Sequence, residues 1–294
     1  MDYTKKCKEW LDIRYSQKTV EGIYRPHQPI YGILGGYCDP GFLIRYITSY
    51  HIFSLLDRLN FNSFIDVGGS EGFTPYRVSK SFGVLVESTD LSKEACDRCE
   101  EIFNIKATPS EITKMPFKDN QFDVSLCSQT LEHVDDLAEA LEELLRITKK
   151  ALIITVPFEK PEQIKHNKEK KWENLHEHIN HFDLESFKHY NKDYKVLKTP
   201  ILSSATVSKM LSLENITNFI ISGKNHDTKL EEIEKSIQDI CLYFLSQDLY
   251  LVQKVENYQG IRVLILKDED SYSESNVTNY NIQDLFSSVP YHYI

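Results

Sequence analysis

The chain contains Phe64-Ile65-Asp66-Val67-Gly68-Gly69-Ser70-Glu71-Gly72, and this stretch decides the fold. Apolar and β-branched residues lead into an acid, the acid leads into a turn of small residues, and the following Phe73-Thr74-Pro75-Tyr76-Arg77-Val78-Ser79 can start a helix. A buried strand followed by a glycine-rich turn and a helix forms the ligand pocket of many α/β folds. Glycines let the backbone approach a ligand, and the helix start offers unpaired N–H groups. A turn that binds no ligand is the alternative, because glycine-rich turns alone are weak motifs.

A second acid supports the interpretation of this turn as part of a ligand pocket. The apolar run Val84-Leu85-Val86 is followed by Glu87-Ser88-Thr89-Asp90, about twenty residues beyond the turn. An acid at the end of the second strand is where such folds bind the hydroxyls of a ribose.

The spacing inside the turn then distinguishes between cofactors. A dinucleotide fingerprint needs glycines at positions 68, 70 and 73, but the chain has serine at 70 and phenylalanine at 73. The spacing acid-x-Gly-x-Gly-x-Gly fits Asp66, Gly68 and Gly72, with Ser70 at the middle glycine.

Taken with three later segments, the turn resembles that of the class I S-adenosylmethionine-dependent methyltransferases. The later segments are, in chain order, Asp90-Leu91-Ser92, Ser110 to Asp123 with its Met115-Pro116-Phe117, and Leu131-Glu132-His133-Val134. The resemblance covers roughly residues 60 to 200. It departs from the family pattern at Ser70, and at Glu111, where aspartate is commoner.

The resemblance implies S-adenosylmethionine as the cofactor. It implies that Asp66 orients the turn and the methionine ammonium, that Asp90 binds the ribose hydroxyls, and that Glu111 accepts from the adenine amine. The full set of cofactor-binding residues that it implies is Asp66, Gly68, Gly69, Gly72, Asp90, Leu91, Glu111, Ile112, Cys127, Ser128 and Gln129.

Three histidines are candidates for accepting a proton from the methyl acceptor, because the pKa of histidine lies near neutrality. They are His133, His178 and His181. For His133 a structural role at the pocket floor is an equal alternative. His176, His178 and His181 also suggest a metal cluster, but no carboxylate clearly completes such a site in the sequence, so we expect no metal.

Composition limits the partners and the location. The formal charge of −10 over 294 residues argues against a broad nucleic-acid surface. No apolar run could span a bilayer, and the charged N-terminus lacks a signal-peptide core, so we expect a cytoplasmic protein with no membrane partner. Cys96-Asp97-Arg98-Cys99 falls inside a helix that Ser92 should cap, and we interpret it as a pair of ordinary thiols.

The pattern of strands and helices predicts an α/β fold with a doubly wound, mostly parallel seven-stranded sheet and an antiparallel last strand. We expect an N-terminal cap of helices and loops at 1–61, the cofactor-binding core at 62–200, a helical insertion at 201–259, and the last strand with a tail at 260–294. The lysine-rich segment 158–173 predicts a mobile, solvated loop. The insertion includes a long amphipathic helix near 229–255, a candidate cap and a candidate dimer interface.

These features predict a methyltransferase that modifies a hydroxyl, or an amine, of a small soluble acceptor such as a sugar. Ser128-Gln129-Thr130-Leu131 stands where the branch of the family that methylates base amines has Pro-Pro-aromatic, which argues against that branch. An NAD(P)-dependent oxidoreductase and a non-catalytic binding module of the same fold are the alternatives.

Overall fold

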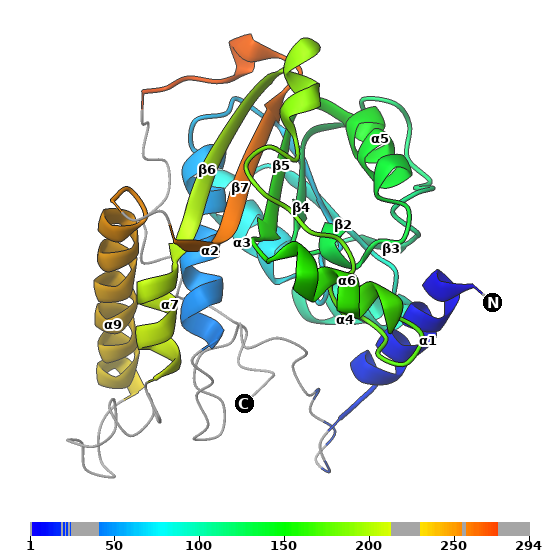
Figure 1. Cartoon of the computed structure of the whole chain (residues 1–294), viewed down its shortest axis with the longest axis horizontal. Coiled ribbons are helices and arrows are strands. Elements are labelled where there is room, and N and C mark those ends of the chain that lie inside the picture. Colours follow the sequence, from blue (N-terminus) through cyan, green and yellow to red (C-terminus); the bar gives the residue numbers. More distant parts are fainter. Residues whose placement is uncertain are drawn as a thin grey trace.

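A computed structural model describes residues 2–18, 20, 22, 24, 41–212, 230–254 and 257–275 (Figure 1). Parts of three predicted regions lie outside these residues: 25–40 of the N-terminal cap, 213–229 of the insertion, and 276–294 of the tail.

Within the described residues the strands form one seven-stranded sheet of order β3-β2-β1-β4-β5-β7-β6. The first five strands run parallel, and β7 pairs antiparallel with both β5 and β6. The strand bounds are β1 Ser63–Val67, β2 Leu85–Asp90, β3 Ala107–Pro109, β4 Phe122–Ser128, β5 Thr148–Pro157, β6 Lys195–Ser203 and β7 Tyr258–Leu266. The predicted fold class is confirmed.

The described helices follow the strands in the expected alternation. They are α1 Tyr3–Tyr15, α2 Gly41–Leu56, α3 Phe73–Phe82, α4 Lys93–Phe103, α5 Leu137–Ile147, α6 Pro161–Glu169, α7 Ser204–Leu211 and α9 Leu230–Leu251, with 3₁₀ turns η1 Leu131–His133, η2 Lys188–Lys192 and η3 Glu269–Ser271. The predicted cap of α4 is confirmed, because Ser92 accepts from the Ala95 N–H, and at the start of α5 Asp136 accepts from the Glu139 N–H.

Helices cover both faces of the sheet, and β5 shows how the strand pattern produces this. Successive side chains of a strand point to opposite faces. Ala151 and Ile153 join the core beneath α2, α7 and α9, whereas Leu152 and Ile154 join the core beneath α5. Full burial of a leucine or isoleucine contributes about 1.5–3 kcal/mol, so these two layers hold the sheet edge rigidly in place.

The insertion helix α9 packs against α2, α7 and β6, on the side of the sheet away from α1 (Figure 1). Its fully buried Asp248 accepts hydrogen bonds from the backbone N–H groups of Leu202 and Ser203, at 3.2 and 2.6 Å. The end of β6 is thereby tied to α9. The cap and dimer roles of this region stay predictions.

The prediction of a mobile loop at 158–173 is wrong for its middle part, which forms α6. Pro161 occupies the first helical position, where its fixed φ favours the helix and its missing N–H costs nothing. Ile164 is buried, and the Asn167 side chain donates to the carbonyl of His178 at 3.0 Å. These contacts are made outside the helix, and the lysine count does not reveal them.

Among the described helices, none combines the length and the apolar character that crossing a membrane requires.

Candidate active site

A cavity of about 490 Å³ lies at the carboxyl ends of β1, β2 and β4. Its walls come from α1, the turn after β1, the end of β2, the loop at 110–113 and the segment at 129–136, with His176 beside them. Open parallel sheets bind ligands at this edge, and the volume falls in the range of small-molecule sites.

Glycines form the turn because side chains would collide there. Gly68 has φ +76°, and a Cβ at this position would lie 2.3 Å from Oγ1 of Thr130. Gly72 has φ +88°, and a Cβ there would lie 2.2 Å from the Cys99 sulfur on α4. Gly68 therefore brings the turn close to the loop after β4, and Gly72 lets α3 pack closely on α4.

Ser70 connects the turn to both walls of the cavity. Its φ of +53° is the left-handed conformation that glycine adopts more readily, which explains why the motif normally has glycine here. Its N–H donates to Oδ2 of Asp90 at 2.9 Å. Its hydroxyl lies 2.5 Å from the Tyr15 hydroxyl on α1.

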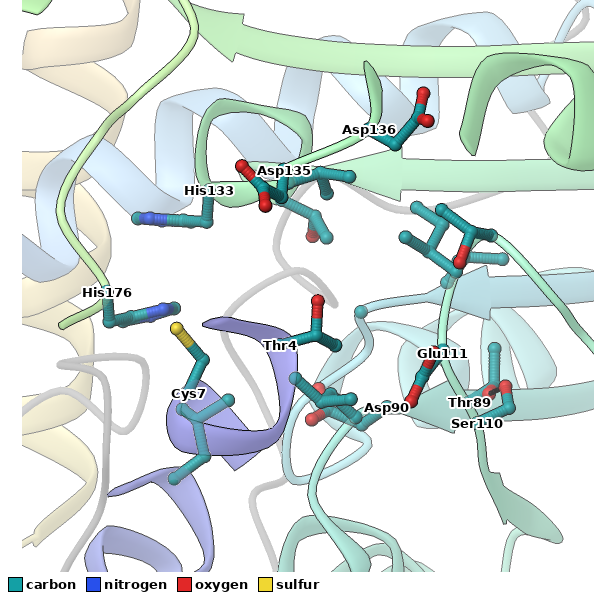
Figure 2. Close-up of a pocket in the computed structure, with 18 of the residues that line it drawn as sticks. Thr4, Cys7, Thr89, Asp90, Ser110, Glu111, His133, Asp135, Asp136 and His176 are labelled. Atoms are coloured by element: carbon teal, nitrogen blue, oxygen red, sulfur yellow. Dashed lines mark hydrogen bonds between the residues drawn. The ribbon is translucent and has the colours of Figure 1, made fainter. Parts of the chain in front are cut away.

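Asp90 is the acid at the end of β2, and its carboxylate faces the cavity (Figure 2). Its second oxygen, Oδ1, accepts from the Ser92 N–H at 2.9 Å. Burial raises the pKa of Asp90 to about 6, although these N–H groups oppose the shift. A buried carboxylate in a fixed orientation is suited to accept hydrogen bonds from the two hydroxyls of a ribose.

Asp66 lies beneath the turn and is 3% exposed. Burial, and then the negative charge of Asp90, raise the pKa of Asp66 to about 8. Across the described residues, no group donates a hydrogen bond to this carboxylate. An acid without a partner in a buried position fits a cationic ligand group such as an ammonium, because a positive charge would restore its usual pKa.

The structure divides the predicted site residues into two groups. Those that line the cavity are Gly68, Asp90, Leu91, Glu111, Ile112, Gln129 and His133. Those that lie outside its lining are Asp66, Gly69, Gly72, Cys127, Ser128, His178 and His181. Cys127 is fully buried, and the Ser128 hydroxyl lies 2.7 Å from that of Thr155. These two side chains pack within the sheet, and so do not face the cavity.

Histidines gather at the opposite side of the cavity from Asp90 and Glu111 (Figure 2). The ring of His133, at the end of η1, stacks on the ring of His176 with centroids 4.0 Å apart. The His178 ring meets the edge of His133 at 4.9 Å. Glu132 completes the group, and its carboxylate lies 4.0 Å from Nε2 of His133. We refer to Glu132, His133 and His178 as the imidazole–carboxylate cluster.

Backbone hydrogen bonds hold the segment of His178 beside Glu132, although the two residues are 46 positions apart in the sequence. The N–H groups of Ile179 and Asn180 both donate to the Glu132 carbonyl, at 2.7 and 3.1 Å. The Asn180 side chain donates to the carbonyls of Leu131 and Val134, at 2.9 and 2.5 Å. The segment that carries His178 is thus fixed onto η1.

Burial and neighbouring charges set the protonation of the cluster. Glu132 is 1% exposed, and burial raises its pKa to about 7, although the charges of His178 and Arg45 oppose the shift. Burial also lowers the pKa of His178, but its hydrogen bond to Glu159, at 2.5 Å, more than compensates, so the net pKa is raised. Burial, and then the charge of His178, lower the pKa of His176 to about 4.

His181 does not join the cluster. Its side chain is 38% exposed and lies 4.0 Å from the carboxylate of Asp183.

Helix α1, which lies within the expected N-terminal cap at 1–61, forms a wall of the cavity. Its buried residues, Tyr3, Cys7, Leu11 and Tyr15, recur every four positions. The fourfold spacing of these residues is the signal that could have identified the helix and its buried face.

A buried ion pair fixes α1 against the core. Arg98 of α4 donates to the Glu71 carboxylate at 2.7 Å, and each side chain is 1% exposed. Arg98 also donates to the carbonyl of Gln17, just beyond α1, and its guanidinium lies over the ring of Tyr15. At the other side of α1, the Ser92 hydroxyl donates to Asp12 at 2.6 Å.

Comparison with known proteins agrees with this geometry. A family model described as "Methyltransferase domain" matches residues 65–154. A search of curated protein sequences gives no match.

Solved structures of low sequence identity share the fold. The geranyl diphosphate C-methyltransferase of Streptomyces coelicolor A3(2), solved with S-adenosyl-L-homocysteine, is 13% identical with a TM-score of 0.51, and the match covers 91% of this chain and 98% of that one. Phosphoethanolamine N-methyltransferase 2 of Haemonchus contortus, solved with S-adenosyl-L-methionine, is 14% identical with a TM-score of 0.54. That match covers 89% of this chain and 60% of the Haemonchus chain.

The turn, the acid after the second strand, the strand order and the matched family model lead to one conclusion. Residues 65–154 match a methyltransferase domain, and the sheet has the fold of solved S-adenosylmethionine-dependent methyltransferases.

Proposed function

We propose that this enzyme methylates a hydroxyl group of a small, polar, soluble acceptor such as a sugar or a related metabolite. The observation that carries the proposal is the imidazole–carboxylate cluster, whose member His133 lines the cavity opposite Asp90. An alcohol must lose its proton as it accepts a methyl group, whereas an amine with a free lone pair can react first and lose its proton later. A cluster of proton-accepting groups is therefore most useful to a hydroxyl acceptor.

The cofactor-binding residues act by holding the cofactor in one orientation. Asp90 would hold the ribose hydroxyls, Asp66 would neutralise the methionine ammonium beneath the turn, and Glu111 would accept from the adenine amine. S-adenosylmethionine supplies a methyl group that is already activated for transfer. The protein must then align the acceptor with that methyl group and exclude water.

Two features of the cluster support a role in removing a proton. The Nδ1 atom of His133 lies 3.2 Å from the carbonyl of Glu177, and a carbonyl can only accept, so this nitrogen carries the proton. The neutral His133 ring therefore has its lone pair on Nε2. The Glu132 carboxylate nearby would stabilise the imidazolium that forms when Nε2 takes a proton.

The test is methyl transfer from labelled S-adenosylmethionine to a panel of sugars, other small hydroxyl compounds, small amines, RNA and protein. We expect product with the hydroxyl compounds, located on oxygen by mass spectrometry and NMR. His133→Ala and His178→Ala should lower kcat, whereas His189→Ala, which removes an exposed imidazole on η2, should not. Exclusive transfer to amines, RNA or protein would refute the proposal.

A further inference from the structure

We propose that Glu132, His133 and His178 bind a divalent first-row transition cation. One ligand atom from each residue lies within 4.8 Å of those of the other two. Two imidazoles and one carboxylate suit zinc, cobalt, manganese or iron(II), and three protein ligands leave positions open for a substrate oxygen.

In both imidazoles Nδ1 lies beside a hydrogen-bond acceptor, so Nε2 is the candidate ligand atom. The Nδ1 atom of His178 lies 2.5 Å from the Glu159 carboxylate, and Nδ1 of His133 lies 3.2 Å from the Glu177 carbonyl. Both partners are acceptors, so each Nδ1 carries a proton, and Nε2 is the nitrogen that offers a lone pair to a cation when the ring is neutral. Metal-bound histidines in proteins characteristically donate their other N–H to a carboxylate or a backbone carbonyl.

The third ligand is a buried carboxylate with one orphaned oxygen. Glu132 is 1% exposed, and its Oε2 atom is buried without a hydrogen-bond partner. Leaving such an oxygen unpaired costs about 1–3 kcal/mol, and more when the group is charged. A cation between Glu132 and the two rings would remove this cost.

The charges around the cluster are mixed. Arg45 and His178 act on Glu132 with positive charge, and Glu159 acts on it with negative charge. His178 must be neutral to bind a cation. The Glu159 carboxylate, which accepts the hydrogen bond from His178, would then balance part of the charge of the cation. The site thus keeps two carboxylates near a divalent ion.

The geometry needs little rearrangement. Metal–ligand distances near 2.1 Å in a tetrahedral site correspond to about 3.4 Å between ligand atoms. His133 Nε2 and Glu132 Oε1 are 4.0 Å apart, and the three ligand atoms all lie within 4.8 Å of one another, so shifts of roughly 1 Å would bring them to this spacing. The hydrogen bonds from Ile179 and Asn180 to the Glu132 carbonyl already hold the backbone in place.

This inference revises the expectation of a metal-free site. That expectation arose because no carboxylate clearly completes a site with His176, His178 and His181 in the sequence. The carboxylate comes instead from η1, which follows β4 and is distant in sequence.

The role of the cation rests on the proposed function, although its binding does not. A hydroxyl oxygen that ligates a divalent ion loses its proton more readily. The cation would then replace His133 as the group that promotes this loss: the proton leaves to water, the oxygen lone pair forms the O–CH₃ bond, and the S–CH₃ bond breaks to give the neutral thioether.

The test uses cobalt(II) as a probe, because its visible absorption reports the geometry of its ligands. The full-length protein is stripped with a chelator and titrated with Co²⁺ in a spectrophotometer and a calorimeter. We expect one equivalent to bind with absorption in the 500–650 nm region, roughly as expected for a site of four or five ligands with imidazole donors. Glu132→Gln and His178→Ala should each abolish this absorption.

Two further variants sharpen the result. Glu159→Gln removes only the acceptor behind His178 and should weaken Co²⁺ affinity by about 10–100-fold, the usual effect of losing such a support. His189→Ala, a matched loss of an exposed imidazole, should leave the affinity unchanged. Thermal unfolding shows whether each variant is folded. If Glu132→Gln does not fold, the Co²⁺ affinities of His178→Ala and Glu159→Gln decide the test.

Two outcomes overturn the proposal: no saturable binding to the unmodified protein at millimolar Co²⁺, or binding that persists with unchanged affinity in the folded variants. Methyl transfer measured in parallel keeps the two claims separate. Transfer to hydroxyl compounds without Co²⁺ binding would refute the cation and leave the proposed function standing. Co²⁺ binding that requires the cluster, without transfer to any hydroxyl compound, would uphold the cation site and refute the proposed function.

Discussion

The hydroxyl of Tyr15 lies 2.5 Å from the hydroxyl of Ser70, which joins the N-terminal helix to the glycine-rich turn. The two residues are 55 positions apart, and Tyr15 is 2% exposed. Because the N–H of Ser70 also donates to Asp90, one serine links α1, the turn and the acid after β2. Helix α1 is therefore part of the cofactor cavity and not merely an appendage of the core.

The first prediction concerns this hydrogen bond. Tyr15→Phe and Ser70→Ala should each lower the free energy of unfolding and weaken the binding of S-adenosylhomocysteine. The double variant should be less impaired than the sum of the two, with a coupling of about 0.5–1.5 kcal/mol, because both single changes break the same bond. Calorimetric affinities of the four proteins measure the coupling. Strict additivity would show that the contact contributes nothing to the site.

The second prediction concerns Asp90. Asp90→Asn should weaken S-adenosylhomocysteine binding by about 1–3 kcal/mol, or roughly 5–150-fold, because the charged acceptor for the ribose hydroxyls is lost. Asp97→Asn, an exposed acid on the neighbouring helix α4, is the matched control and should bind normally. An unchanged dissociation constant for folded Asp90→Asn would remove Asp90 from the cofactor site.

The third prediction is a pH dependence that arises from Asp66. Its folded-state pKa of about 8 means that the carboxyl is largely protonated at pH 7 in the free protein. A ligand ammonium needs the ionised form, so affinity for S-adenosylhomocysteine should rise as pH increases from 7 to 8.5, by roughly five- to tenfold. In Asp66→Asn this rise should disappear. A wild-type affinity that is flat over the same interval contradicts the assigned role.

The fourth prediction tests the buried ion pair. Arg98→Met should lower the free energy of unfolding by about 3–5 kcal/mol, because it leaves the Glu71 carboxylate buried without its cation. Replacing both residues, as in Glu71→Leu with Arg98→Met, should recover part of the loss. Lys93→Met breaks an exposed pair with Asp97 on the same helix and serves as the control, with no measurable change expected. Urea unfolding curves provide the comparison, and equal stabilities for Arg98→Met and Lys93→Met would contradict it.

Local signals explain why much of the fold was predictable from the sequence. The run Phe64 to Gly72 combines an apolar strand with a turn of small residues, and both properties depend on neighbouring residues only. The caps at Ser92 and Asp136 are likewise local. The resemblance in four ordered segments then indicated the sheet topology and the cofactor.

Features that depend on long-range contacts were not predictable. His178 meets Glu132 only because the backbone of residues 179 and 180 donates to the carbonyl of residue 132. Helix α6 is stabilised by the burial of Ile164 and by a side-chain contact to the following segment, and a lysine-rich composition conceals both. The position of α1 over the cavity depends on Arg98, whose partners come from two separate parts of the chain.

The most direct test of the central claim is a crystal structure of the protein with S-adenosylhomocysteine. We expect the ribose hydroxyls within hydrogen-bond distance of the Asp90 carboxylate, the adenine beside Glu111, and the sulfur directed toward His133. A ligand bound elsewhere, or a cavity that excludes the thioether while NAD binds in its place, would contradict the account.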